Sequence, residues 1–335
     1  MINKPSQFSG PIMASALALT LLSTCESGRH NVGEVLSPSD LDIADTASDD
    51  DISSGQPVLD LGPRNILIEQ DGVKPGLIEI GCDYNGSKWI GKLQGNGNRD
   101  VLIYIPSGVN TASPFEIIYH FHGTHSQLVK EVIPELPGTS ERYRGKAGHT
   151  SPGENRLRQV LDASQNLGEG GRNVITVYPL SAGRRGKKGN ASDIHGFDSF
   201  WMLTGGNDTG DDMHMLHAEV LAVVENELIG MPIVVDSITA KGHSAGGRPL
   251  ENIAASGFPL DRIDFLDASY GRWTTHCHRD AIAANPDVQM NIFYIPNTPT
   301  QADAKRLEGK TGVRLIPTST PHADMNSEFF GWNRD

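Results

Sequence analysis

The chain has 335 residues, and its hydrophobic fraction of 37% is enough apolar material for one large domain or two modest ones. Its 28 Lys and Arg residues are outnumbered by 41 Asp and Glu residues, which gives a formal net charge of -13. Because binding to a phosphate backbone draws mainly on an excess of Lys and Arg, this charge argues against a nucleic-acid partner.

Residues 1–25 have the features of a secretory signal. Lys4 precedes an apolar run, residues 12–22, that is too short to span a bilayer and is followed by Ser-Thr-Cys. The stretch resembles a bacterial lipoprotein signal, which implies that Cys25 is lipidated and that this lipid is the protein's membrane contact. Thr24 departs from the Gly, Ala or Ser usual before the Cys, so cleavage by an ordinary signal peptidase stays the alternative. We therefore expect either a periplasmic or outer-membrane lipoprotein or an extracellular protein.

Two features between the signal and the folded part fit an exported protein. Residues 26–63 are rich in Ser, Asp, Gly and Pro, a composition typical of a disordered acidic linker. Beyond the signal the cysteines are Cys82 and Cys277, an even pair in a compartment where disulfides persist. We expect a bridge between them, with two buried free thiols as the alternative.

Residues 64–335 alternate short apolar runs with helical patterns and show no internal repeat, so we expect a single domain. The expected strands are 77–80, 100–105, 115–121, 174–178, 237–242, 263–267, 291–295 and 313–316. The expected helices are 154–167, 212–229, 246–255, 277–284 and 300–308. This rhythm predicts an α/β fold with a mostly parallel central sheet of about eight strands and helices on both faces.

The strongest local signal is Gly-His-Ser-Ala-Gly, centred on Ser244 between an expected strand and an expected helix. This context predicts a nucleophile elbow, a tight turn that lifts the serine hydroxyl above the edge of the sheet. Glycines two positions before and after the serine remove side chains that would collide with neighbouring elements. The turn also makes the backbone N–H of Ala245 available to stabilise an oxyanion. The alternative is that Ser244 merely caps the helix 246–255.

With this elbow, the sequence from residue 77 to the C-terminus resembles the α/β-hydrolase superfamily, in a layout similar to secreted polyhydroxybutyrate depolymerases and feruloyl esterases. The resemblance implies an α/β-hydrolase fold and a serine esterase that uses no cofactor. In those enzymes a strand ending in His-Gly supplies the second half of the oxyanion hole, and the matching segment here is 115–124. The match implies that the backbone N–H of Gly123 or Thr124 faces that of Ala245.

A serine hydroxyl needs a base, and the base needs an acid that holds its tautomer. The superfamily order is Ser, acid, His, and His322 follows the last expected strand, where the superfamily places its base. Asp267 closes an apolar strand at the edge of the sheet where Ser244 lies, and we prefer it as the acid. Asp303, after the next strand, occupies the commoner superfamily position and stays open as the alternative. His276 and His278 lack a second ligand cluster, so we expect no metal.

Substrate contacts are expected from the long loops 126–153 and 181–211. Phe200 and Trp201 in the second loop suit flat apolar or sugar-like groups, although packing onto the domain is equally consistent with them. The expected reaction is hydrolysis of a small-molecule or polymer ester through an acyl-enzyme. The alternatives are a surface-tethered binding protein on an inactive hydrolase scaffold, or a peptidase or glycan deacetylase of the same fold. The sequence gives no oligomeric state.

Overall fold

The structure is a computed structural model that describes residues 65–67, 83–123, 152–182, 201–207 and 209–332. All of them belong to one compact unit of the chain. Several sequence predictions fall outside these ranges: the signal with Cys25, the linker 26–63, the strand 77–80, Cys82, Thr124 and Phe200. Within the described ranges, no helix is both long and apolar enough to cross a membrane.

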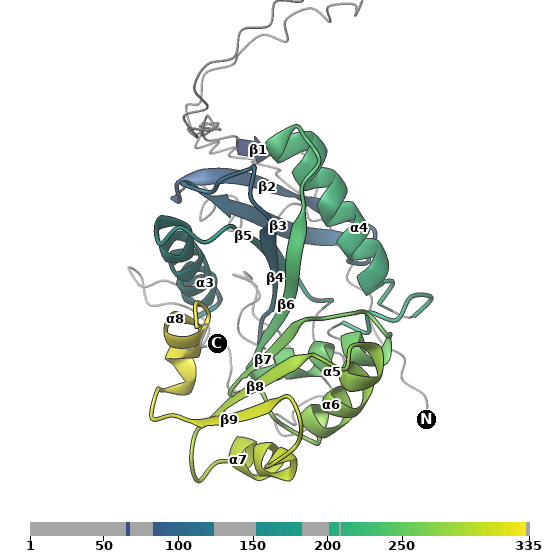
Figure 1. The fold of residues 1–335 in the computed structure, drawn as a ribbon, viewed down its shortest axis with the longest axis vertical. Helices are drawn as coiled ribbons and strands as arrows, with labels where there is room; N and C mark the ends of the chain where they lie inside the picture. The colour runs from purple at the N-terminus through teal and green to yellow at the C-terminus, as the bar shows by residue number, and fades with distance from the viewer. Residues whose placement is uncertain (1–64, 68–82, 124–151, 183–200, 208, 333–335) are drawn as a thin grey trace, which may run out of the picture. The chain divides into compact units, whose positions relative to one another are not determined.

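The described residues form a nine-stranded sheet with the strand order β1-β2-β3-β5-β4-β6-β7-β8-β9 (Figure 1). The strands are β1 (Asn65–Leu67), β2 (Gly86–Leu93), β3 (Arg99–Pro106), β4 (Phe115–Phe121), β5 (Val174–Pro179), β6 (Val235–His243), β7 (Arg262–Leu266), β8 (Gln289–Tyr294) and β9 (Val313–Pro317). Strands β4 to β9 are parallel, β3 is antiparallel to both β2 and β5, and the short β1 is parallel to β2. The predicted mostly parallel sheet is therefore confirmed.

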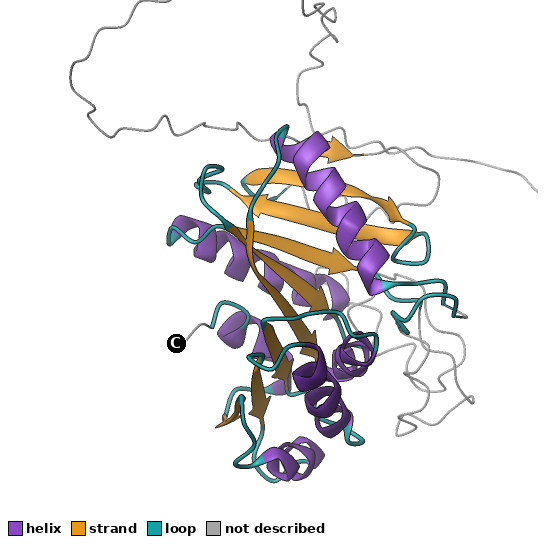
Figure 2. Ribbon diagram, turned by 45° about the vertical axis from the view of Figure 1, so that its right-hand side comes forward, coloured by secondary structure: helices purple, strands orange, loops and turns teal. Residues whose placement is uncertain are grey.

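Helices cover both faces of this sheet (Figures 1 and 2). They are α3 (Pro152–Glu169), α4 (Met213–Val223), α5 (Gly247–Ala255), α6 (Trp273–Ala284), α7 (Pro299–Ala304) and α8 (Met325–Phe329). A π-helical turn, Val224–Ile229, continues α4, so the single helix expected over 212–229 contains a change of hydrogen-bonding pattern. Helices α3 and α8 lie on one face, and α4, α5 and α6 lie on the other (Figure 1).

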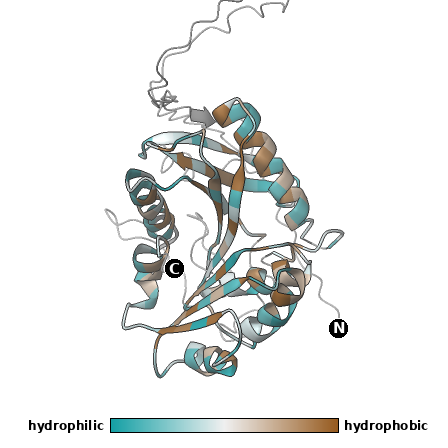
Figure 3. Cartoon of the chain, viewed as in Figure 1, coloured by the Kyte–Doolittle hydropathy of each residue, from teal (hydrophilic) through white to brown (hydrophobic). Residues whose placement is uncertain are grey.

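Two apolar layers, one on each face of the sheet, make up most of the core. In β3, Leu102 and Tyr104 join the layer under α3, while Val101, Ile103 and Ile105 join the layer under α4 and α5. This alternation follows from the two-residue period of a strand. Figure 3 shows hydrophobic and hydrophilic residues side by side on the larger helices, as expected of helices with one buried face.

Candidate active site

Ser244 lies in a tight turn between β6 and α5. Its φ of +58° is in the left-handed region, which costs an L-residue roughly 1–2 kcal/mol. A Cβ added to Gly242 would lie 2.3 Å from Gly246 O, and one added to Gly246 would lie 2.1 Å from Phe121 O. Both glycines are therefore required by close backbone approach, and the predicted geometry of the elbow is confirmed.

The alternative role of Ser244 as a helix cap is wrong. The residue that precedes α5 is Gly246, and no side chain caps the helix there. The first N–H groups of a helix have no hydrogen-bond partner within that helix. The backbone N–H of Ala245 is such a group, because Ala245 lies in the single 3-10 turn, Ser244–Gly246, that leads into α5. Ser244 is partly exposed, whereas Ala245 is buried. The turn thus combines an accessible hydroxyl with a backbone donor for negative charge.

Asp267 and His322 form a hydrogen-bonded pair. Asp267 follows β7, and its Oδ2 accepts a hydrogen bond of 2.6 Å from His322 Nδ1. The Asp267 side chain is 5% exposed and the His322 side chain 39%. Two further groups satisfy the other carboxylate oxygen, Oδ1: Thr300 Oγ1 donates at 2.5 Å and the backbone N–H of Ile295 donates at 3.4 Å. Asp267 also has a positive φ of +46°, so the backbone holds this carboxylate in an unfavourable conformation.

Asp303 has different partners. Its Oδ2 accepts a hydrogen bond of 3.0 Å from Thr274 Oγ1, and its Oδ1 lies 3.6 Å from Arg306 Nε. Asp303 belongs to α7, which begins after β8, whereas Asp267 ends the preceding strand. In the structure the partner of His322 is thus the acid that the sequence favoured, one strand earlier than the commoner superfamily position.

The elbow, His322 and the strand end of β4 meet at one edge of the sheet, because the carboxyl ends of parallel strands lie together. A Cβ on Gly123 would lie 2.8 Å from Ser244 Cβ and 3.3 Å from Ser244 Oγ, so the backbone after β4 passes directly beside Ser244. The rings of His322 and of His243, which precedes Ser244, lie 4.7 Å apart. Among the described residues Ser244 and His322 share no hydrogen bond; such contacts are often long until substrate is bound.

Two histidines that the sequence did not single out belong to this edge. His122 is fully buried, and its Nδ1 donates to Gly123 O at 2.8 Å while its Nε2 accepts from Ser181 N at 3.2 Å. This contact fixes the carbonyl of the glycine that faces Ser244. His243 is 2% exposed and contacts the backbone of His322. The signal for both was their position next to a motif glycine or serine.

The expected substrate contact at Trp201 is wrong. Trp201 is fully buried, its indole N–H donates to Asn96 Oδ1 at 3.1 Å, and its ring packs edge-on against Phe121 and His122. Neither face of the indole is available to a ligand, and packing onto the domain is the correct interpretation. Its neighbour Phe200 lies outside the described residues.

The structure also corrects the expected disulfide for Cys277, while Cys82 lies outside the described residues. Cys277 is a buried free thiol in α6, and its Sγ donates to Leu250 O at 3.4 Å. Its side chain is buried between α5 and α6 and does not reach the surface. The same burial raises the pKa of the Cys277 thiol well above its ordinary value. Across the ranges that the structure describes, no group of three or more His, Cys, Asp or Glu could hold a metal ion.

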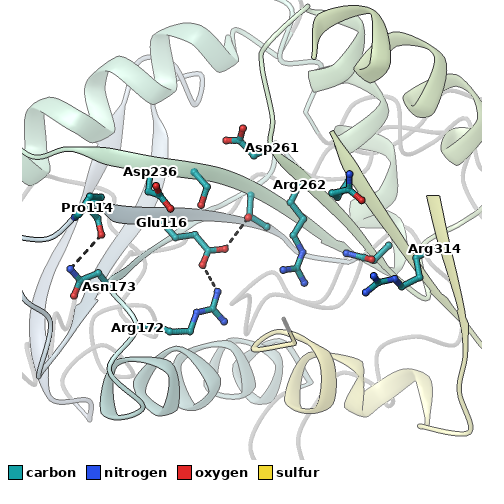
Figure 4. A pocket seen from close by; sticks show the side chains of 12 residues that line it. Pro114, Glu116, Arg172, Asn173, Asp236, Asp261, Arg262 and Arg314 are labelled. Atoms are coloured by element: carbon teal, nitrogen blue, oxygen red, sulfur yellow. Dashed lines mark hydrogen bonds and ion pairs between the residues drawn. The ribbon is translucent and has the colours of Figure 1, made fainter. Parts of the chain in front are cut away.

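A polar cavity of about 570 Å³ lies at the opposite edge of the sheet, at the amino ends of the parallel strands (Figure 4). Glu116, Arg172, Asp236 and Arg262 are among its lining residues. Glu116 forms an ion pair with Arg172 and accepts a hydrogen bond of 2.9 Å from Thr239. Ser244 follows the carboxyl end of β6, where ligands of open α/β sheets bind. This cavity lies at the other ends of the strands and is therefore separate from the candidate active site.

No protein-family model and no curated protein matches the sequence. Among solved structures, the chain is similar to esterase B from Lactobacillus rhamnosis, with 9% identity and a TM-score of 0.38 over 76% of this chain and 84% of that one. It is also similar to siderophore hydrolase EstB from Aspergillus nidulans, with 14% identity and a TM-score of 0.33 over 72% and 93%. A third is carboxyl esterase 2 from Tuber melanosporum, with 11% identity and a TM-score of 0.37 over 80% and 89%.

The fold is recognised from the sheet and the elbow. Strands β2 to β9 run in the order 2-3-5-4-6-7-8-9, and the second of these eight, β3, is antiparallel to its neighbours. The strand β6 leads into a serine turn and a helix, and a histidine follows the last strand. The chain has the α/β-hydrolase fold.

Proposed function

We propose that this chain is a serine hydrolase that cleaves carboxylic esters through an acyl-enzyme. Ser244 is the nucleophile, His322 the general base and Asp267 the acid that orients it. The observation that carries the proposal is the 2.6 Å hydrogen bond from His322 Nδ1 to Asp267 Oδ2, beside a serine held at a φ of +58°. An ordinary surface serine has no need of such strain or of an oriented imidazole beside it.

In the proposed reaction each of these groups has one role. Because Asp267 accepts the proton on Nδ1, the neutral His322 ring offers its other nitrogen, Nε2, as a base. His322 takes the proton of the Ser244 hydroxyl as Oγ attacks the ester carbonyl carbon. The N–H of Ala245 and an N–H of the segment after β4 stabilise the oxyanion. The imidazolium then protonates the leaving alcohol, and a water molecule repeats the sequence on the acyl-enzyme, which releases the acid and restores Ser244.

The choice of an ester over an amide rests on the sequence resemblance to secreted esterases. A fluorophosphonate probe tests the reaction class without knowledge of the substrate, because it phosphonylates activated serines. We expect a single adduct, seen by intact mass, that is lost in Ser244→Ala. No adduct on a folded wild-type protein would favour the binding-protein alternative.

Rates on short p-nitrophenyl esters, compared with peptides and acetylated sugars, test the bond that is cleaved. We expect the esters to be turned over fastest. Faster release of acetate from a sugar, or of an amine from a peptide, would move the proposal to a deacetylase or a peptidase of the same fold.

We also propose that the protein is exported and tethered by a lipid on Cys25, with residues 26–63 as a spacer. The support is the N-terminal sequence pattern described above. The mature protein is expected to partition into a detergent phase, and Cys25→Ser is expected to move it into the aqueous phase. A mature N-terminus that can be sequenced directly and that begins elsewhere would show release by an ordinary signal peptidase.

A further inference from the structure

His243 connects the nucleophile to the base through the backbone. It is the last residue of β6, and Ser244 follows it directly. Its Nε2 lies 2.8 Å from the carbonyl oxygen of His322, a contact between residues 79 positions apart in the chain. The two rings lie 4.7 Å apart at an interplanar angle of 36°, so His243 also supports one face of the catalytic imidazole.

The partner of Nε2 determines the tautomer of His243. A carbonyl oxygen only accepts hydrogen bonds, so Nε2 must carry the proton. Burial lowers the pKa of His243 well below its ordinary value, and the electrostatic effects of His322, Arg156 and His120 lower it further; the contact with the His322 carbonyl raises it. The ring is therefore neutral at neutral pH, which keeps a second positive charge away from the imidazolium that forms on His322.

The turn that carries His322 needs such an anchor. His322 begins the short 3-10 turn His322–Asp324, and its side chain is 39% exposed. On the α3 side, Gln159 Nε2 donates to Ala323 O at 3.2 Å and to Asp324 Oδ1 at 3.4 Å. The hydrogen bond from His243 joins this turn to the strand that leads into Ser244. The acceptor is the backbone carbonyl of His322 itself.

We propose that His243 is a positioning residue that sets the distance between His322 and Ser244. This role rests on the proposed function, since it concerns the same base and nucleophile. Asp267 fixes the rotation of the imidazole through Nδ1, and His243 fixes the backbone from which that imidazole extends. Because β6 is an inner strand of the sheet, the two reacting groups share one rigid support.

Two substitutions of equal length separate this role from simple core packing. His243→Gln places an amide nitrogen at the same number of bonds from Cα as Nε2, so it keeps a donor to His322 O. His243→Met has the same length without a donor. We expect the second-order rate of fluorophosphonate labelling and kcat/KM to fall about tenfold in His243→Met, the effect of about one hydrogen bond. In His243→Gln we expect them to return to within about threefold of wild type. KM should change little in either variant, since His243 lies beneath the site.

Circular dichroism and the denaturation midpoint establish that each variant is folded. A readout independent of activity is ¹⁵N NMR of histidine-labelled protein, which should show His243 as the neutral tautomer protonated on Nε2. Equal rates in the Met and Gln variants, or a His243 protonated on Nδ1, would overturn the positioning role alone. A wild-type protein that the probe does not label would instead overturn the proposed function, and this role with it.

Discussion

The most decisive substitution is Asp267→Asn, because the surroundings of Asp267 dictate how the new amide must lie. The inner oxygen, Oδ1, accepts hydrogen bonds from Thr300 Oγ1 and from the backbone N–H of Ile295. These two donors require an oxygen at that position, so the amide NH₂ of Asn would take the place of Oδ2. That NH₂ would face His322 Nδ1 as a donor, and the ring would have to move its proton to Nε2.

The expected loss follows from that tautomer. With the proton on Nε2, His322 has no lone pair directed at the Ser244 hydroxyl and cannot act as its base. We expect kcat/KM for a p-nitrophenyl ester to fall by about 10³ to 10⁴. This corresponds to about 4 to 5.5 kcal/mol of transition-state stabilisation. The fold should persist, because the substitution changes one oxygen to nitrogen and removes no volume.

Asp303→Asn is the matched control. Its amide oxygen can still accept from Thr274 Oγ1, and its contact with Arg306 is a 3.6 Å pair with a half-exposed guanidinium. Since such pairs contribute little, we expect kcat/KM to stay within about threefold of wild type. The reasoning is refuted if Asp267→Asn retains more than about a tenth of the activity, or if Asp303→Asn loses as much as Asp267→Asn.

Gly246→Ala is expected to destabilise the fold by several kcal/mol in urea unfolding, because its Cβ would meet Phe121 O at 2.1 Å. Gly257→Ala, at a φ of +74° with no atom within 4 Å, should cost only about 1–2 kcal/mol, and equal costs would remove the steric argument. Trp201→Phe should lower stability by about 1–3 kcal/mol with KM unchanged, whereas a raised KM would restore a substrate role to Trp201. Cys277 should react with iodoacetamide only after denaturation, without any reductant; labelling that requires a reductant would instead indicate a disulfide.

Strands β3 to β9 could be predicted because most of them contain a short apolar run. The expected strands from 100–105 to 313–316 coincide with β3 to β9 within one or two residues at most ends. Strand β2 was missed because Gly86-Ser-Lys-Trp-Ile-Gly-Lys-Leu93 interrupts its apolar residues with two glycines and two lysines. Its hydrogen bonding to β3 stabilises the strand, although its glycines and lysines have low strand propensity.

Part of the candidate site could be predicted from the sequence, and the contacts that could not be predicted share a physical reason. Ser244, His322 and Asp267 could be named from motif and chain order, because each ends or follows an apolar strand. The sequence could not show that Thr300 and Ile295 satisfy the acid, since those contacts depend on how the loop after β8 folds back. Trp201 was misread for a similar reason: an aromatic residue in a glycine-rich loop has the same sequence context whether it faces solvent or the core.

The carboxylate that binds His322 follows β7, not the strand next to that of His322. Asp267 reaches the imidazole from the end of β7, while the loop after β8 contributes only a hydroxyl and a backbone N–H. A sequence pattern that demands a carboxylate after the strand next to that of the base would reject this chain, although its acid and base are joined. Chains in which the carboxylate follows another strand are better sought by spatial templates of serine, imidazole and carboxylate than by the order of residues along the polypeptide.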